Sequence, residues 1–251
     1  MLEMPRSPFW RNGKRRRHPR RWVRVAATFA LLEMPRTNHT ARMNSLSRRK
    51  FLALSSLSLV AACAGGAEPE WQPLFDGKTL GKWKETDFAG HADVSVKDGA
   101  ILLPMGGDIT GINLEIAPAK MGYEIEMQAK RIEGDDFFCG LTFPVADKCV
   151  TLVVGGWGGS VVGISNVDGE NASENETTTY KNFEKGRWYK IRVRVTKAKI
   201  EAWIDAEQVV DLAIEGKNLE MRIGEIESSK PLGIATWRTA GALKDLRWRK
   251  L

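Results

Sequence analysis

The sequence predicts an all-β fold, a sandwich or jelly roll, for most of its length. No segment keeps a 3.6-residue apolar period long enough for an amphipathic helix. Short stretches instead alternate apolar and polar residues, as strands with one buried face do. Glycines and other turn residues recur between these stretches at short intervals. Two antiparallel sheets packed face to face are therefore expected.

The individual strands follow from alternation and turn chemistry. Asp98-Gly99 predicts a hairpin, because this pair supplies the positive φ angles of a type I′ turn. Tyr123 to Ala129 alternates strictly, so its aromatic and aliphatic residues should face inward and Glu124 and Glu126 outward. Trp188 and Trp203 are expected to pack within the sandwich. Further strands are expected at 137–143, 149–154, 161–167, 191–196, 200–205, 208–213, 231–237 and 243–248.

The charge of the chain divides at residue 63. The formal net charge is +7, but residues 1–63 hold 14 of the Arg and Lys residues and only two acids. This leaves 24 basic and 29 acidic residues in 64–251, a net charge of about −5. Nucleic acid is therefore not expected as a partner. The 188 residues after Cys63 are enough for one domain with its own core.

Residues 43–63 are expected to form an export signal. After Met43 come a short basic region, an apolar run from Phe51 to Ala62 that is too short to span a bilayer, and then Cys63. The sequence S-R-R-K-F-L resembles a twin-arginine signal, and V-A-A-C resembles a bacterial lipobox, which would make Cys63 the lipidated first residue. Cleavage near 64–67 without lipidation is the alternative. We expect an exported protein of the bacterial cell envelope, periplasmic or at the surface, that meets the membrane only through this lipid.

Residues 1–42 form an Arg-rich, low-complexity segment that repeats L-E-M-P-R at 2–6 and 32–36. Such a segment has no core-forming pattern. It is interpreted as a mis-assigned or disordered extension, with Met43 as the true start; a transit-like peptide is the alternative. The expected division is an extension at 1–42, the signal at 43–63, a tether at 64–70 and a single domain at 71–251.

Several motifs in the expected domain resemble one family. They are L-F-D-G-K-T-L-x-x-W from Leu74, V-K-D-G-A-I from Val96, G-R-W-Y-K-I-R-V-R-V from Gly186, and P-L-G-I-A-T-W from Pro231. In this order they resemble the 3-keto-disaccharide hydrolase domain from about Trp71 to the end of the chain. The resemblance implies a concanavalin A-like jelly roll and a secreted, carbohydrate-directed protein. Some relatives cleave glycosides already oxidised to a ketone at C3. Residues 134–143 and 233–238 differ from the family's usual sequence.

The implied reaction requires a base for the C2 proton, a group that stabilises the enolate, and an acid for the leaving group. His91 is a candidate base because its ordinary pKa lies near neutrality, and a polar surface residue is the alternative. Asp135 and Asp136 are candidate base and acid, or oxygen ligands for Ca²⁺. Because adjacent strand residues point to opposite faces, only one of the two is expected in a cleft. Plain turn carboxylates are the alternative.

Sugar binding is expected mainly at Val153–Tyr180. Trp157 lies between two glycine pairs and is a candidate stacking platform, with core packing as the alternative. Trp237, beside Arg238, is a second candidate. The polar block after Val167 offers sugar-binding groups or oxygen ligands for Ca²⁺, although it lacks EF-hand spacing. A solvated loop remains its alternative. The candidate residues of this block are Asp168, Asn171, Glu174, Asn175 and Glu176.

Metal and thiol chemistry are limited. His91 is the only histidine after residue 63, so only an oxygen-ligated metal is expected: no cofactor is required and Ca²⁺ is possible. Cys139 and Cys149 lie on the two arms of one expected hairpin, where a disulfide is possible. The expected function is cleavage of 3-keto-glycosides by a hydrolase or lyase. A non-catalytic glycan-binding or cell-surface interaction module remains the alternative.

Overall fold

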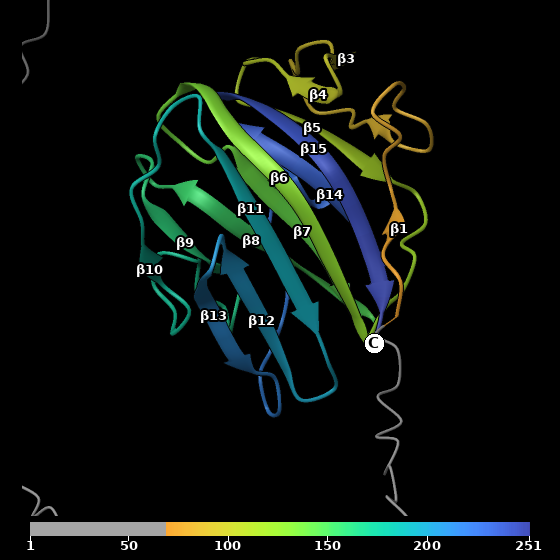
Figure 1. Ribbon diagram of the computed structural model, residues 1–251. Coiled ribbons are helices and arrows are strands. Elements are labelled where there is room, and N and C mark those ends of the chain that lie inside the picture. The colour runs from red at the N-terminus through yellow and green to blue at the C-terminus, as the bar shows by residue number, and fades with distance from the viewer. Residues whose placement is uncertain (1–68) are drawn as a thin grey trace, which may run out of the picture. The chain divides into compact units, whose positions relative to one another are not determined.

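The computed structural model describes residues 69–251, which form two antiparallel β-sheets packed face to face (Figure 1). The predicted sandwich is confirmed. Residues 1–68 lie outside the described part, and with them lie the expected signal peptide, the tether up to residue 68, and Cys63. Within the described part, no helix is long and apolar enough to cross a membrane.

The first sheet has eight strands, and the 12-residue strands β6 and β15 lie at its centre. In spatial order the strands are β13 (Glu207–Ala213), β12 (Lys199–Ile204), β11 (Trp188–Val195), β6 (Tyr123–Gly134), β15 (Thr239–Lys250), β4 (Ala100–Leu103) and β3 (Ser95–Lys97), with β1 (Gln72–Pro73) also paired to β15. The expected hairpin joins β3 to β4, with positive φ at Asp98 and Gly99.

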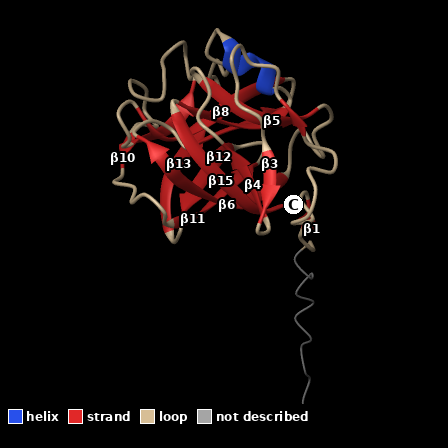
Figure 2. Cartoon of the chain, turned by 90° about the horizontal axis from the view of Figure 1, so that it is seen from above, coloured by secondary structure: helices blue, strands red, loops and turns tan. Residues whose placement is uncertain are grey.

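The second sheet has seven strands and carries the short helix η1 (Glu225–Ser229) on its outer face (Figure 2). The strand order is β10 (Thr179–Tyr180), β9 (Val161–Ser165), β8 (Lys148–Gly156), β7 (Cys139–Val145), β14 (Leu232–Trp237), β5 (Ile109–Leu114) and β2 (Lys84–Glu85). Gly233 of β14 lets η1 pack directly on the sheet, because a Cβ there would come within 2.5 Å of the Ser229 carbonyl oxygen.

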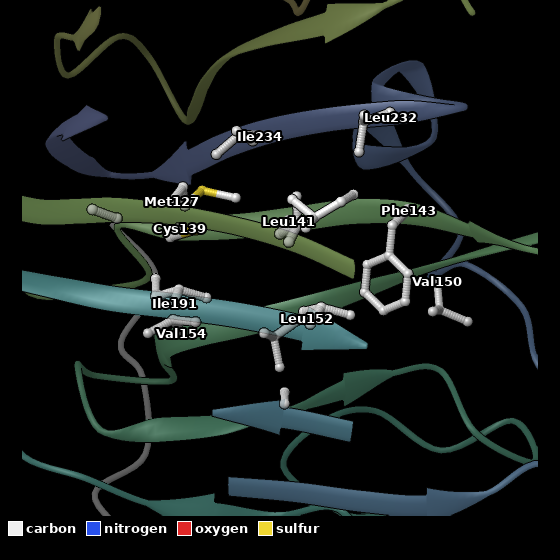
Figure 3. Close-up of a cluster of buried hydrophobic side chains, with 14 of the residues drawn as sticks. Met127, Cys139, Leu141, Phe143, Val150, Leu152, Val154, Ile191, Leu232 and Ile234 are labelled. Atoms are coloured by element: carbon white, nitrogen blue, oxygen red, sulfur yellow. The ribbon is translucent and has the colours of Figure 1, made fainter. Parts of the chain in front are cut away.

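The core fills the space between the two sheets. Figure 3 shows Met127 and Ile191 from the eight-stranded sheet together with Leu141 and Leu152 from the seven-stranded sheet; all four side chains are buried. Each comes from an apolar position of an alternating strand, and burial of such side chains supplies roughly 25 cal/mol per Å² of apolar surface. The inward positions predicted for β6 are confirmed.

The outer face of the eight-stranded sheet is a cross-strand ladder of charges. Glu124 and Glu126 point outward as predicted, yet both are buried, because basic residues of β11 and β15 cover them from either side. Arg194 lies 2.7 Å from Glu124, and Lys190 lies 2.8 Å from Glu126. Covering a carboxylate in this way keeps it paired while it is removed from water.

Trp188 and Trp203 also lie on this outer face, so the expectation that they pack within the sandwich was wrong. Alternation explains the placement: Tyr189 of β11 and Ile204 of β12 are the buried neighbours, and the tryptophans therefore point outward. Their rings lie under cations instead. Lys244 is 4.5 Å from the ring centre of Trp188, and Arg192 is 4.1 Å from that of Trp203.

The possible disulfide between Cys139 and Cys149 is absent, and within the described residues 69–251 neither thiol is bonded to another. The predicted hairpin of β7 and β8 is confirmed, but its register pairs Cys139 with Val154 and Cys149 with Pro144. The two cysteines are thus five positions apart along the ladder, or roughly 17 Å at about 3.4 Å per residue. A disulfide requires Cα atoms within about 7 Å of each other.

Candidate functional site

A cleft of about 470 Å³ opens on the outer face of the seven-stranded sheet. This volume lies within the roughly 300–1,000 Å³ of small-molecule sites. Thr151 and Val153 of β8 form part of its floor, since they alternate with the core residues Val150, Leu152 and Val154. Loops supply the walls. The remaining lining residues are Ile109, Asp136, Phe137, Trp157, Ser165, Trp237 and the segment 222–226.

A second, larger groove of about 860 Å³ lies beside β1 and the start of β2. It is lined by residues 72–76, Thr79, the 114–118 segment and Trp248, among others. None of the site residues predicted from the sequence lines it. Asp76 in this groove accepts backbone hydrogen bonds from Lys78 and Thr79, which lower the pKa of its carboxyl. That carboxylate closes its own turn, so we take the smaller cleft as the candidate site.

Trp157 forms one wall of the cleft, from the turn that joins β8 to β9. The residue is 40% exposed and its φ is 48°, a left-handed conformation. Arg222 belongs to the segment that leads into η1. Its guanidinium carbon lies 5.8 Å from the centre of the Trp157 ring. The prediction that Trp157 is available to a ligand agrees with this placement. Arg222 was missed, because an arginine in a loop carries no sequence signal of its own.

Asp136 brings a carboxylate to the cleft, whereas Asp135 does not line it. Oδ1 of Asp136 accepts a hydrogen bond from the Phe137 backbone N–H at 2.7 Å, and Oδ2 accepts one from the Gly158 N–H at 3.4 Å. Asp135 points elsewhere and pairs with Lys185 at 3.2 Å. The expectation that only one of these adjacent residues enters a cleft agrees with this geometry.

Trp237 forms another part of the wall, at the end of β14. Its ring stacks on Phe137 with 6.5 Å between ring centres and an angle of 29° between planes. Arg238, the next residue, does not line the cleft: its Nε donates to Asp108 Oδ1 at 2.6 Å, which raises the pKa of the guanidinium. Arg238 thus fastens the end of β14 to the segment before β5 and holds Trp237 in place. Phe137 was also missed from the sequence.

The polar block 168–176 does not line the cleft. Asn175 is buried and serves its own loop: its Nδ2 donates to the Ile164 carbonyl at 2.8 Å, and its Oδ1 accepts from the Thr177 N–H at 2.9 Å. The other members are Asp168 and Glu176, both paired with Lys217, and Asn171 and Glu174, which are joined to each other by a hydrogen bond. The loop covers part of β9, because Gly163 leaves space for the Ala172 carbonyl.

His91 lies away from the lining of the cleft. Its Nδ1 is 2.7 Å from the Phe88 carbonyl oxygen, and its Nε2 is 4.0 Å from Glu85 Oε2. The structure therefore brings Asp136, Trp157 and Trp237 together and leaves His91 and Asp135 outside. Across residues 69–251, no group of three or more His, Cys, Asp or Glu side chains is placed to hold a metal ion.

Comparisons with known proteins identify a family. Residues 70–251 match the family described as the 3-keto-alpha-glucoside-1,2-lyase-like domain. A comparison with curated protein sequences gave no match.

Comparisons with solved structures give distant similarities. Carbohydrate-binding module CBM66 from Bacillus subtilis is 11% identical over 67% of this chain and 96% of its own, with a TM-score of 0.46. A putative glycosyl hydrolase from Parabacteroides distasonis is 14% identical over 72% and 94%, with a TM-score of 0.47. A galectin-like protein from Bacillus subtilis is 10% identical over 72% and 94%, with a TM-score of 0.46. The two-sheet fold stands on this chain's own strand pairing.

Proposed function

Because the chain belongs to the 3-keto-alpha-glucoside-1,2-lyase-like domain family, we propose that its cleft binds and cleaves 3-keto-α-glucosides. Membership makes this a carbohydrate-related domain. The observation that carries the finer proposal is the cleft itself, in which the Asp136 carboxylate and the Arg222 guanidinium line one space with Trp157 and Trp237. Aromatic faces suit the C–H faces of a sugar ring, and the two charged groups suit proton transfer and stabilisation of an anion.

The proposed step is an elimination across C1 and C2. The C3 ketone acidifies the C2 hydrogen, Asp136 removes that proton, and Arg222 stabilises the negative charge on the enolate oxygen. The electron pair forms the C1–C2 double bond as the bond from C1 to the leaving oxygen breaks. The proton held by Asp136 ends on that oxygen or in water, so the products are an alcohol and a conjugated enone. Addition of water to the enone would complete a hydrolysis.

The first test compares Asp136→Asn with Asp135→Asn. Methyl 3-keto-α-D-glucopyranoside is the substrate, and the rise of enone absorbance and the release of methanol are followed. We expect wild type and Asp135→Asn to cleave the substrate. The rate of Asp136→Asn should be lower by about 10²-fold or more, since removal of a general base costs about this much. Full activity in Asp136→Asn would refute the assignment. Added EDTA or Ca²⁺ tests the expectation that no cofactor is required.

A second candidate function, a non-catalytic sugar-binding module, is favoured by one observation. Both carboxylate oxygens of Asp136 already accept backbone N–H groups, which is also what a purely structural carboxylate does. The two candidates differ in a paired measurement on wild type: calorimetric binding of the same 3-keto-glucoside and its turnover. Binding without turnover, with or without Ca²⁺, supports the module and rejects the enzyme.

We also propose export to the bacterial cell envelope with a lipid on Cys63, from the basic, apolar and V-A-A-C sequence of residues 43–63. A Cys63→Ser variant should move from the membrane fraction to the soluble fraction, because it lacks the thiol that is acylated. Immunoblots of separated membrane and soluble fractions measure this. Cys149→Ser is the matched control and should fractionate like wild type. Membrane association of Cys63→Ser equal to that of wild type would contradict the lipid anchor.

A further inference from the structure

Arg131 is an arginine at a core position beneath the cleft. It follows Met127 and Ala129 on the inward face of β6, where the alternation calls for an apolar residue. The residue is only 4% exposed. Burial of a guanidinium is costly unless the group is hydrogen-bonded. The contacts of this side chain therefore indicate its role.

The guanidinium joins two loops that line the cleft. Its Nη2 lies 3.0 Å from the Asp136 carbonyl oxygen, 3.1 Å from that of Gly155 and 3.0 Å from that of Gly159. The first carbonyl belongs to the loop between β6 and β7, and the other two flank the turn that carries Trp157. One cation therefore holds the backbone on both sides of Trp157 and at Asp136.

Two glycines of the turn around Trp157 leave space for this guanidinium. A Cβ at Gly155 would lie 2.5 Å from Arg131 Nη2, and one at Gly159 would lie 3.2 Å from Nη1. Both glycines also have positive φ, at 78° and 105°. Gly155 and Gly159 therefore suit both the close approach of Arg131 and the left-handed backbone of the turn. This gives a physical reason for the first and last glycines of the Gly-Gly-Trp-Gly-Gly sequence.

The surroundings of Arg131 keep the group fixed. The rings of Phe138 and Phe183 lie 5.2 Å and 6.0 Å from its guanidinium carbon. Burial lowers the pKa of Arg131, and the carboxylates of Asp135 and Asp136 act in the opposite direction. Among residues 69–251, its Nε has no hydrogen-bond partner. The hydrogen bonds of Arg131 go to carbonyl oxygens of the two loops. A side chain with such contacts holds the backbone of those loops in place.

We propose that Arg131 is a positioning residue, which sets Trp157 and Asp136 relative to each other and so fixes the shape of the ligand site. Its effect on a sugar rests on the proposed function, whereas its effect on the Trp157 turn does not. Without the guanidinium, three carbonyls lose their common donor, and the Trp157 turn gains freedom to move. The expected consequence is a more mobile Trp157 ring and weaker binding in the cleft.

The test measures acrylamide quenching of tryptophan fluorescence for Arg131→Met and Arg131→Lys. Each change is made in the wild-type and in the Trp157→Phe background. In the wild-type background, we expect each Arg131 substitution to increase the quenching. In the Trp157→Phe background, the same substitution should change the quenching by at most half as much. The lysine variant keeps the charge but lacks the planar guanidinium that is fixed between the three carbonyls. It should therefore show a smaller increase in quenching, and it replaces the methionine variant if that variant does not fold. Equal changes in both backgrounds would overturn the proposal.

Arg192→Met is the matched control, because Arg192 stacks on Trp203 on the outer face of the eight-stranded sheet, whereas the Trp157 turn belongs to the seven-stranded sheet. Its effect on quenching should be the same whether or not Trp157 is present. Calorimetry with methyl 3-keto-α-D-glucopyranoside forms the second arm, in which Arg131→Lys should bind about 10-fold more weakly than wild type. Wild-type affinity in that variant would overturn the effect on the ligand site. If wild type itself does not bind, the proposed function fails, and the quenching arm still decides the role of Arg131.

Discussion

At the scale of single residues, Trp157 combines an unfavourable backbone with an exposed ring. A left-handed conformation costs a residue with a side chain about 1–2 kcal/mol, and Trp157 has a φ of 48°. A large aromatic residue here contributes little to the core, since 40% of it is exposed. Such strain at an exposed position indicates a role outside folding. This combination supports the proposed ligand-binding role of Trp157.

Trp157→Gly separates binding from stability. Glycine adopts positive φ without strain, so we expect the melting temperature to stay equal to that of wild type or to rise slightly. The loss of the ring should weaken binding of a 3-keto-α-glucoside about 5- to 10-fold, in line with roughly 1 kcal/mol for an aromatic contact. Thermal denaturation and calorimetry measure the two effects. A large fall in melting temperature with unchanged affinity would show that Trp157 is a packing residue.

Cys139 is a second residue whose surroundings decide its chemistry. Complete burial raises the pKa of its thiol to about 12, and the thiolate is the reactive form. In the folded protein at pH 8, we expect Cys139 to resist iodoacetamide and to react once urea unfolds the chain. Mass spectrometry of the cysteine peptides measures this. Rapid labelling of Cys139 in the folded state would contradict the buried position between the sheets.

At the scale of elements, strand β6 links the core, the charged face and the cleft. Its inward side chains pack in the core, its outward Glu124 and Glu126 form the charge ladder, and its end places Arg131 under the cleft. The period-2 pattern was enough to predict the strand and its two faces. Burial of the outward glutamates could not be predicted, because it depends on the register that places basic residues of β11 and β15 beside them.

The ladder predicts a dependence of stability on acid. Burial raises the pKa of Glu126, but hydrogen bonds and charges from Lys190 and Arg247 outweigh it, so the pKa lies below the ordinary value of 4.5. A group with a lowered folded-state pKa stabilises the protein above its unfolded pKa, and this contribution is lost as pH falls through the folded value. Glu126→Gln should therefore be less stable than wild type at pH 7, and the gap should narrow towards pH 3.

Urea denaturation at pH 7 and at pH 3 measures that gap. Glu133→Gln is the matched control, since Glu133 is an exposed residue of the same strand. Its urea midpoint should remain close to that of wild type. A gap between Glu126→Gln and wild type that is equally large at both pH values would show that the ion pairs of Glu126 do not stabilise the fold.

At the scale of the whole molecule, the sandwich could be predicted from the sequence, but only part of the site could. Alternation and turn residues predict strands, and strand motifs in a fixed order predict the fold. Asp136, Trp157 and Trp237 were predicted individually, and the register of the seven-stranded sheet brings them to one face. The polarity of the block 168–176 predicts a place at the ligand, yet its side chains bond to their own loop, to β9 and to Lys217 instead. Phe137, Arg131 and Arg222 carry no local signal, because their importance arises from three-dimensional contacts.

We propose that a sugar ligand binds on the outer face of the seven-stranded sheet. A crystal structure of Asp136→Asn with a bound 3-keto-α-glucoside tests it most directly, because this variant should bind substrate without consuming it. We predict the sugar ring beside Trp157 and Trp237, with C2 next to residue 136 and the ketone oxygen towards Arg222. Density for the sugar in the groove beside Trp248, or on the charged face around Trp203, would contradict the claim.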